Sequence, residues 1–174
     1  GVASLRPVAG RLESIVEGQP FSVIVDYAPE PASLAALYEA LDLIPHGRII
    51  HVLGSTGGGR DVARRTVLGA MAAAHDDVVI VTNEDPYDDD PMGIIQDVAD
   101  GARGAKIEEK DLFLILDRQE AIQKAMECAK PGDLVLLTGK GCEPVMAVAH
   151  GKKIPWDDRV AARASLKKLG YATH

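Results

Sequence analysis

The residues best suited to chemistry are two glycines that flank a lysine and precede a carboxylate: Gly139, Lys140, Gly141 and Glu143. They follow an apolar run of strand length that ends at Leu137. Glycine lets a backbone adopt positive φ and approach a ligand closely, and in an open α/β sheet ligands bind beyond the carboxyl ends of the strands. The segment therefore predicts a binding loop. An ordinary turn with a surface lysine is the competing interpretation, because the spacing is not that of a P-loop.

A second candidate loop is the glycine-rich run from Gly54 to Gly59, which is followed by Arg60 and then by a helical pattern. Backbone amides at the start of a helix bind anions, and an arginine offers a forked pair of donors to a carboxylate or phosphate. The run lacks the G-x-G-x-x-G spacing of dinucleotide-binding loops. We expect an anion site here, with a flexible surface turn as the alternative.

A third loop carries five carboxylates between Glu84 and Asp90. Carboxylates bind ammonium groups and metal ions. Glu84 and Asp85 come directly after an apolar strand pattern and are the stronger candidates for ligand binding. The carboxylates at 88–90 read equally well as a solvated loop that caps the next helix.

Neither histidine nor cysteine predicts a metal or nucleophile site. The five histidines are scattered singly, and His51 falls inside a strand pattern, where a core histidine is expected. Cys128 and Cys142 have neither metal-ligand spacing nor the pattern of a disulfide framework. Trp156 is expected to pack beside a helix cap at Asp157.

These loops need a scaffold that positions them. Periodicity predicts strands at 11–16, 21–27, 48–53, 77–82, 112–116 and 134–138, helices at 31–43, 61–74, 91–102, 117–129 and 157–169, and a hairpin within 145–154. Nearly continuous apolar strands that alternate with helices are typical of a mostly parallel sheet covered on both faces. We therefore expect an α/β fold with an antiparallel edge strand or hairpin. In the second helix, Val67, Leu68 and Met71 are expected to face inward.

Length and composition predict a single domain. The chain has 174 residues, and 47% of them are hydrophobic, which is enough for a core. A net charge of −7 argues against non-specific nucleic-acid binding, which needs clustered Lys and Arg. No apolar run approaches the roughly 20 residues that span a bilayer, and the start of the chain shows no apolar core of a signal peptide. We expect a cytoplasmic protein with no nucleic-acid or membrane partner.

Six short motifs, in order along the chain, resemble the C-terminal domain of the Mur ligases, and most closely that of the UDP-N-acetylmuramoyl-tripeptide synthetases. They are Gly10 to Glu13, Val25 to Pro31, Gly58 to Gly69, Thr82 to Pro86, Gly139 to Glu143 and Trp156 to Arg159. Each motif alone is weakly specific, whereas six in register cover nearly the whole chain. The resemblance implies a Rossmann-like fold. It also implies that residues 1–174 are one C-terminal domain, without the central ATPase domain and the N-terminal UDP-binding domain.

The resemblance further implies an ATP-dependent ligase that adds a diamino acid to UDP-N-acetylmuramoyl-L-alanyl-D-glutamate in peptidoglycan synthesis, with this fragment inactive alone. ATP and Mg²⁺ would be bound mainly by the central domain, against which this domain packs. Arg11 would reach the ATP phosphates and Asp26 the ribose. The incoming amino acid would be surrounded by Arg60, Asp85, Tyr87, Gly139 and Glu143. The alternatives are the C-terminal domain of a cyanophycin or folylpolyglutamate synthetase, and a free-standing ligand-binding module.

Several positions depart from the usual motifs. Pro29 and Glu30 replace a usual His-Thr, and Cys142 replaces a histidine. Asp85 stands in place of an asparagine. Tyr87 stands in place of an arginine that would pair with a distal carboxylate.

The departure at Tyr87 bears on which amino acid is added. A substrate with a second carboxylate would meet Asp85 unpaired and be repelled, whereas a side-chain ammonium group would find acceptors. We therefore expect lysine or ornithine in preference to meso-diaminopimelate, unless Arg64, Arg65 or Lys140 supplies the missing charge.

Overall fold

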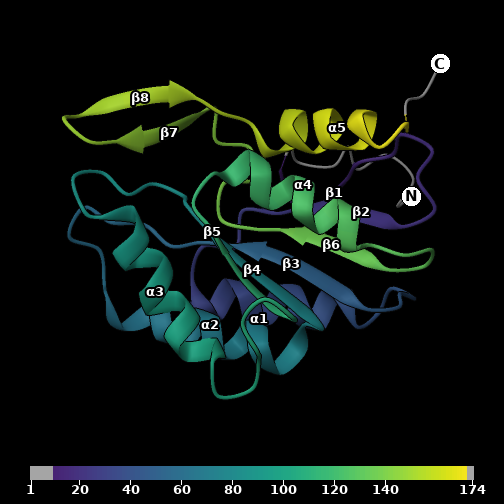
Figure 1. The fold of residues 1–174 in the computed structure, drawn as a ribbon, viewed down its shortest axis with the longest axis horizontal. Helices are drawn as coiled ribbons and strands as arrows, with labels where there is room; N and C mark the ends of the chain where they lie inside the picture. Colours follow the sequence, from purple (N-terminus) through teal and green to yellow (C-terminus); the bar gives the residue numbers. More distant parts are fainter. Residues whose placement is uncertain (1–9, 172–174) are drawn as a thin grey trace, which may run out of the picture.

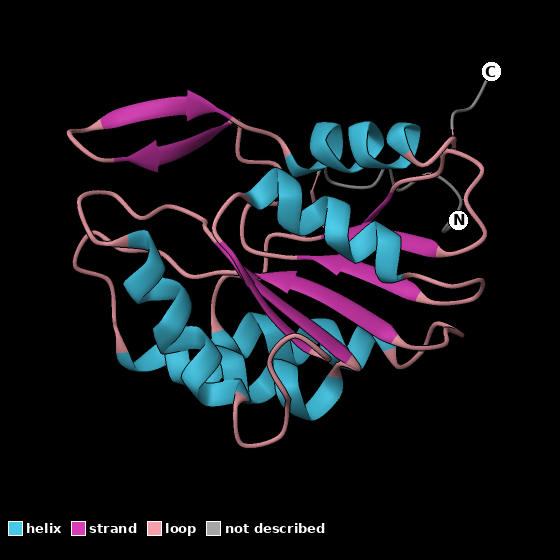
Figure 2. Cartoon of the chain, in the orientation of Figure 1, coloured by secondary structure: helices cyan, strands magenta, loops and turns pink. Residues whose placement is uncertain are grey.

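The structure is a computed structural model that describes residues 10–171. The start of the chain, where we expect no signal peptide, and His174 lie outside that range. The described residues form a six-stranded sheet with helices on both faces and a separate two-stranded hairpin (Figure 1, Figure 2). This arrangement confirms the expected α/β class.

The strands are β1 Glu13–Ser14, β2 Ser22–Val25, β3 Ile49–Leu53, β4 Val78–Thr82, β5 Leu112–Ile115, β6 Leu134–Leu137, β7 Val145–Val148 and β8 Lys152–Pro155. The main sheet has the order β1-β2-β6-β3-β4-β5, so strands far apart in sequence lie side by side. β1 pairs antiparallel with β2, and all other neighbours in this sheet are parallel. β7 and β8 form the predicted hairpin, which projects beyond the helices in Figure 1.

The helices are α1 Pro31–Leu41, α2 Ala63–His75, α3 Pro91–Ala102, α4 Arg118–Cys128 and α5 Asp158–Lys168. On one face of the sheet α1, α2 and α3 bury Leu37, Leu68 and Ile95, and on the other α4 and α5 bury Ile122 and Leu166 (Figure 1). β3, β4 and β6 are buried at every residue, as expected for parallel strands covered on both faces. No helix among residues 10–171 has the length and apolar character needed to cross a bilayer.

Local chemistry fixes where several elements begin. Asp90, Asp117 and Asp157 each accept a hydrogen bond from a backbone amide in the first turn of α3, α4 and α5. The first strand is shorter than predicted, because Gly10 and Leu12 adopt positive φ (64° and 45°) and bend the chain before β1.

Helices α2 and α3 cross closely because a glycine of each meets the backbone of the other. A Cβ on Gly69 would lie 1.8 Å from the carbonyl oxygen of Val98, and one on Gly101 would lie 2.0 Å from that of Thr66. The buried positions of α2 include the small residues Gly69, Ala72 and Ala73. The prediction that Val67 faces inward is wrong, since this residue is 46% exposed.

We expect Gly101→Ala to lower the melting temperature, because the added methyl group meets the backbone of α2. Overpacking of this kind costs about 1–3 kcal/mol. Gly104→Ala is the control, since nothing lies within 4 Å of a Cβ there. Thermal unfolding followed by circular dichroism measures both variants, and an unchanged melting temperature for Gly101→Ala would contradict the close crossing.

Candidate functional site

Three loops, those after β3, β4 and β6, meet at the carboxyl edge of the sheet. With the chain that follows β2 they enclose a small cavity of about 80 Å³. Its lining consists of Tyr27, Pro29, Glu30, Thr56, Arg60, Arg64, Glu84, Asp85, Tyr87 and Glu143. The structure therefore brings together Arg60, Asp85, Tyr87 and Glu143, which the sequence predicts as contacts of one ligand.

Lys140 is fully buried and joins two of these loops. Its Nζ lies 2.9 Å from each carboxylate oxygen of Asp85 and 2.7 Å from Oε2 of Glu143. An ammonium group removed from water needs such partners. The competing interpretation of a surface lysine is therefore wrong.

The pairing also corrects the expectation that Asp85 stands unpaired. Lys140 balances its charge, and the amide of Ala147 in β7 donates to Oδ1 at 2.7 Å. Of the three cations considered as substitutes for the missing arginine, Lys140 thus reaches Asp85 directly. A second substrate carboxylate would meet a neutralised aspartate.

Gly139 lies beside the cavity rather than in its wall. Its φ is 100°, and a Cβ there would lie 2.2 Å from Oε2 of Glu84. Only glycine allows this approach. The loop after β6 consequently packs its backbone directly on the carboxyl group of Glu84.

Glu84 is a carboxyl group of this cavity without a bonded partner. It is 3% exposed, and none of residues 10–171 donates a hydrogen bond to it. Burial raises its pKa to about 7, and the positive charges of Arg118, Lys140 and Arg64 oppose that rise. A carboxyl group in this state is partly protonated at neutral pH, and an arriving cation would ionise it.

Arg60 is the matching cation. It is exposed at the end of the glycine run, where Gly58 and Gly59 adopt positive φ (69° and 78°). Within the described part of the chain no carboxylate forms an ion pair with it. Its guanidinium is therefore available to an anion that enters the cavity.

The two other arginines of this region are already occupied. Arg64 contacts the carboxylate of Glu30 and the hydroxyl of Thr56. Arg65 lies outside the cavity lining and forms an ion pair with Asp97 at 2.8 Å. Their side chains hold the glycine run in place, because both contact it or its neighbours.

Tyr87 closes the cavity from the loop after β4. Its φ is 52°, and its ring lies against Gly58, where a Cβ would come within 2.8 Å of Cδ2. The Tyr87 amide donates to the carbonyl oxygen of Ala147 at 3.2 Å. The tyrosine therefore joins the glycine run to the hairpin, without bringing a charge.

The remaining carboxylates of the acidic loop have structural partners. Asp90 caps α3, Asp89 accepts from the amide of Gly58 at 3.2 Å, and Asp88 accepts from the amide of His150 at 2.7 Å. The helix-capping interpretation is thus confirmed for Asp90. Among residues 10–171 no group of three or more His, Cys, Asp or Glu side chains is arranged to hold a metal ion.

Arg11 and Asp26 lie at the border of the same region. Asp26 is buried and accepts from the amides of Leu12 at 2.8 Å and Ala28 at 2.9 Å, which fixes the segment that carries Arg11. The guanidinium of Arg11 lies over the ring of Tyr27, 5.3 Å from its centre. The predicted nucleotide contacts therefore adjoin the cavity, since Tyr27 lines it.

His51 is a core residue, as predicted. Its ring is fully buried, with Nδ1 2.7 Å from Oδ2 of Asp76 and Nε2 2.8 Å from Oγ1 of Thr138. The hydroxyl of Tyr38 donates to the same oxygen of Asp76 at 2.7 Å. This network fixes Thr138, which directly precedes the Gly139–Glu143 loop.

No sequence pattern described above singles out Arg118. Its side chain is fully buried and pairs with Asp158 at 2.8 Å. The available signal was an arginine at the start of a helix whose inward positions are otherwise apolar. Trp156 does more than pack beside the helix cap, because its indole Nε1 donates to Asp158 at 2.8 Å.

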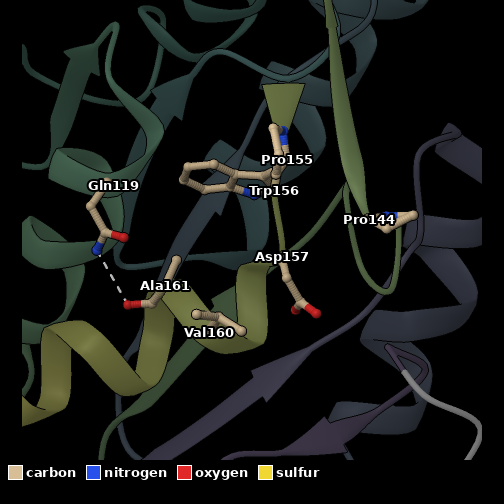
Figure 3. A pocket seen from close by; sticks show the side chains of 7 residues that line it. All are labelled: Gln119, Pro144, Pro155, Trp156, Asp157, Val160 and Ala161. Atoms are coloured by element: carbon tan, nitrogen blue, oxygen red, sulfur yellow. Dashed lines mark hydrogen bonds between the residues drawn. The ribbon is translucent and has the colours of Figure 1, made fainter. Parts of the chain in front are cut away.

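A larger cavity of about 420 Å³ lies elsewhere, between the hairpin and the start of α5 (Figure 3). Its lining is mostly apolar: Gln119, Pro144, Pro155, Trp156, Asp157, Val160 and Ala161. The amide of Gln119 is bonded to the carbonyl oxygen of Ala161 at 3.2 Å (Figure 3). The larger cavity contains none of the predicted ligand contacts, whereas the small cavity contains Arg60, Asp85, Tyr87 and Glu143 together, so the small cavity is the candidate site.

Residues 10–141 match the family model described as Mur ligase, glutamate ligase domain. The chain belongs to this family. The match covers β1 to β6, and with them the glycine run, the acidic loop and Lys140. Membership in the Mur ligase family agrees with the resemblance drawn from the six motifs.

Two similar proteins illustrate the relationship. The UDP-N-acetylmuramyl-tripeptide synthetase of Roseiflexus sp. (strain RS-1) is 44% identical over 94% of this chain and 32% of its own length. The UDP-N-acetylmuramoyl-L-alanyl-D-glutamate--2,6-diaminopimelate ligase of Solibacter usitatus (strain Ellin6076) is 39% identical over 98% of this chain and 34% of its own. The chain thus spans about a third of the length of these Mur ligase relatives.

A solved structure of a UDP-N-acetylmuramoyl-L-alanyl-D-glutamate--2,6-diaminopimelate ligase superimposes with a TM-score of 0.82 at 29% identity. It matches 98% of this chain and 34% of the other. The Mur ligase domain fold is therefore shared over nearly all of the 174 residues.

We expect Glu84 to make the protein less stable as pH rises. Its pKa in the folded state, about 7, lies above the value of 4.5 for an unperturbed glutamate. The contribution of Glu84 to the free energy of unfolding is therefore fully present below pH 4.5. It falls as pH rises toward 7, by on the order of 3 kcal/mol. Glu84→Gln should remove this loss, and the exposed Glu39→Gln should not. Urea unfolding at pH 5 and pH 8 measures the change in the free energy of unfolding. The same pH dependence in the unaltered chain, Glu84→Gln and Glu39→Gln would contradict the raised pKa of Glu84.

Proposed function

We propose that the chain is the amino-acid-binding and lid domain of a longer, cytoplasmic, ATP-dependent ligase. That ligase adds a diamino acid to UDP-N-acetylmuramoyl-L-alanyl-D-glutamate in peptidoglycan synthesis. The observation that carries the proposal is a cavity in which, among residues 10–171, the carboxyl group of Glu84 and the guanidinium of Arg60 have no bonded partner. An amino acid presents the opposite charges. Membership in the Mur ligase family and the names of similar proteins support this substrate class.

Each charged group has a proposed task in binding the amino acid. Arg60 holds the α-carboxylate through a forked pair of hydrogen bonds. Asp85 and Glu143, fixed by Lys140, and the unpaired Glu84 face the distal ammonium group. Gly139 packs on the carboxyl group of Glu84 and Tyr87 lines the cavity, and neither of them adds charge.

The nucleotide chemistry is proposed to need the rest of the longer protein, which would hold ATP and Mg²⁺. The γ-phosphoryl group of ATP would pass to the donor carboxyl group, giving an acyl phosphate and ADP, and the amine of the amino acid would then form the amide bond as phosphate leaves. Arg11 is proposed to reach the phosphates as this domain closes, and Asp26 to reach the ribose. The 174 residues alone are accordingly proposed to be inactive.

The charge balance of the cavity favours lysine or ornithine over meso-diaminopimelate. The cavity and Lys140 behind it contain four carboxylates, Glu30, Glu84, Asp85 and Glu143, against three cations, Arg60, Arg64 and Lys140. With Glu84 protonated these charges balance, and with Glu84 ionised the cavity has one negative charge in excess, which suits a substrate that brings one extra ammonium group and no second carboxylate. The preference therefore depends on Glu84, the carboxyl group without a bonded partner, and not on an unpaired Asp85.

We expect the chain to bind lysine more tightly at pH 8 than at pH 6, by about tenfold, because Glu84 must lose its proton to accept an ammonium group. Calorimetric titration with lysine, ornithine and meso-diaminopimelate measures the preference and its pH dependence. Glu84→Gln should abolish the pH dependence, and Glu39→Gln should preserve it. Tighter binding of meso-diaminopimelate by tenfold or more would overturn the preference.

We expect Arg11→Ala in the full-length protein to reduce kcat/KM for ATP by at least about tenfold, near 1.4 kcal/mol. The reason is the loss of a positive charge beside the phosphates in the transition state. Arg163→Ala, on the exposed face of α5, is the control. Steady-state kinetics with varied ATP decide the matter, and unchanged kinetics for Arg11→Ala would show that this arginine does not reach the nucleotide.

A further inference from the structure

A buried ion pair lies at the carboxyl ends of β4 and β6, next to the loops that form the cavity. Arg118 begins α4 and Asp158 begins α5, and both side chains are fully buried. Nε and Nη2 of Arg118 donate to Oδ1 and Oδ2 of Asp158, each at 2.8 Å. A buried ion pair adds little net stability compared with apolar packing of the same volume. The function of the pair is therefore better judged from the other hydrogen bonds that the Arg118 guanidinium donates.

The remaining donors of Arg118 reach the ends of two strands that do not pair with each other. Nη2 donates to the carbonyl oxygen of Thr138 at 2.7 Å, and Nη1 donates to that of Asn83 at 3.2 Å. Thr138 directly follows β6 and Asn83 directly follows β4, while β3 lies between these strands in the sheet. One guanidinium thus spans the edge of the sheet.

These two carbonyl groups stand at the start of the loops that form the cavity. The residue after Asn83 is Glu84, and the residue after Thr138 is Gly139. The positive charge of Arg118 is also the strongest influence that opposes the burial-induced rise in the pKa of Glu84. Arg118 therefore acts on the geometry of both loops and on the charge of one of their side chains.

Asp158 is in turn held by the short segment that leads from the hairpin into α5. The indole Nε1 of Trp156 donates to Oδ1 of Asp158 at 2.8 Å, and Asp157 caps the helix. Trp156 and Asp157 appear side by side along this segment in Figure 3. The last of the six sequence motifs therefore fixes the carboxylate that orients Arg118.

We infer that Arg118 is a positioning residue for the amino-acid site, oriented by Asp158. Its fork sets the separation of the loops that carry Glu84 with Asp85 and Lys140 with Glu143. The inference rests on the proposed function insofar as it takes the small cavity as the amino-acid site. It assigns a task to the start of α5, which contributes no residue to the cavity lining itself.

The test uses Arg118→Lys, which keeps the charge but loses the planar fork. Backbone amide signals of residues 83–85 and 138–143 are recorded by NMR without ligand, and lysine affinity is measured by calorimetry. We expect displaced signals in both loops and at least about a fivefold loss of affinity, because small misplacements of binding groups are costly. Arg48→Lys is the matched control, since Arg48 pairs with Asp133 at 2.6 Å at the opposite edge of the sheet.

The two readouts separate this inference from the proposed function. If the unaltered chain binds no amino acid, the proposed function fails, and the ligand-free NMR comparison still tests Arg118. Loop signals in Arg118→Lys that move no more than those in Arg48→Lys would overturn the inference. If Arg118→Lys does not fold, Asp158→Glu, which keeps the carboxylate but displaces it, is measured in the same way with the same expected and contradicting results.

Discussion

The site depends on a lysine ammonium group that has no access to water. A buried charge is tolerated when it is paired and hydrogen-bonded, and Lys140 meets this condition through Asp85 and Glu143. Asp85 belongs to the loop after β4 and Glu143 to the loop after β6, whose strands are separated by β3. Pairing the ammonium group therefore holds together two loops that the sheet itself leaves apart.

Close backbone packing determines the electrostatics of the same edge. A Cβ on Gly54 would lie 2.6 Å from the carbonyl oxygen of Thr82, and one on Gly139 would lie 2.2 Å from Glu84. These approaches enclose the Glu84 carboxyl group in backbone rather than water, and desolvation is the main cause of its raised pKa. The two glycines thus create a carboxyl group whose charge responds to what enters the cavity.

Two departures from the usual family motifs change the charge of the site. Asp85 in place of an asparagine and Tyr87 in place of an arginine each make the site one unit more negative. Tyr87 still packs on Gly58, and Asp85 still anchors β7 through the amide of Ala147. The loop after β4 is consequently held by packing on Gly58, by the amide of Ala147 and by Lys140.

The sequence by itself determined the elements and the edge of the sheet at which chemistry is placed. Apolar runs identified every strand of the parallel sheet, and aspartates at 90, 117 and 157 marked the helix starts, because these signals are local. Only the tertiary structure decided which charges meet. Lys140 pairs with Asp85, which is 55 residues away in the sequence, and Arg118 pairs with Asp158, which is 40 residues away. The outward turn of Val67 likewise follows from the crossing of α2 and α3. Such pairings depend on strand order and helix contact, which the periodicity of a single segment does not specify.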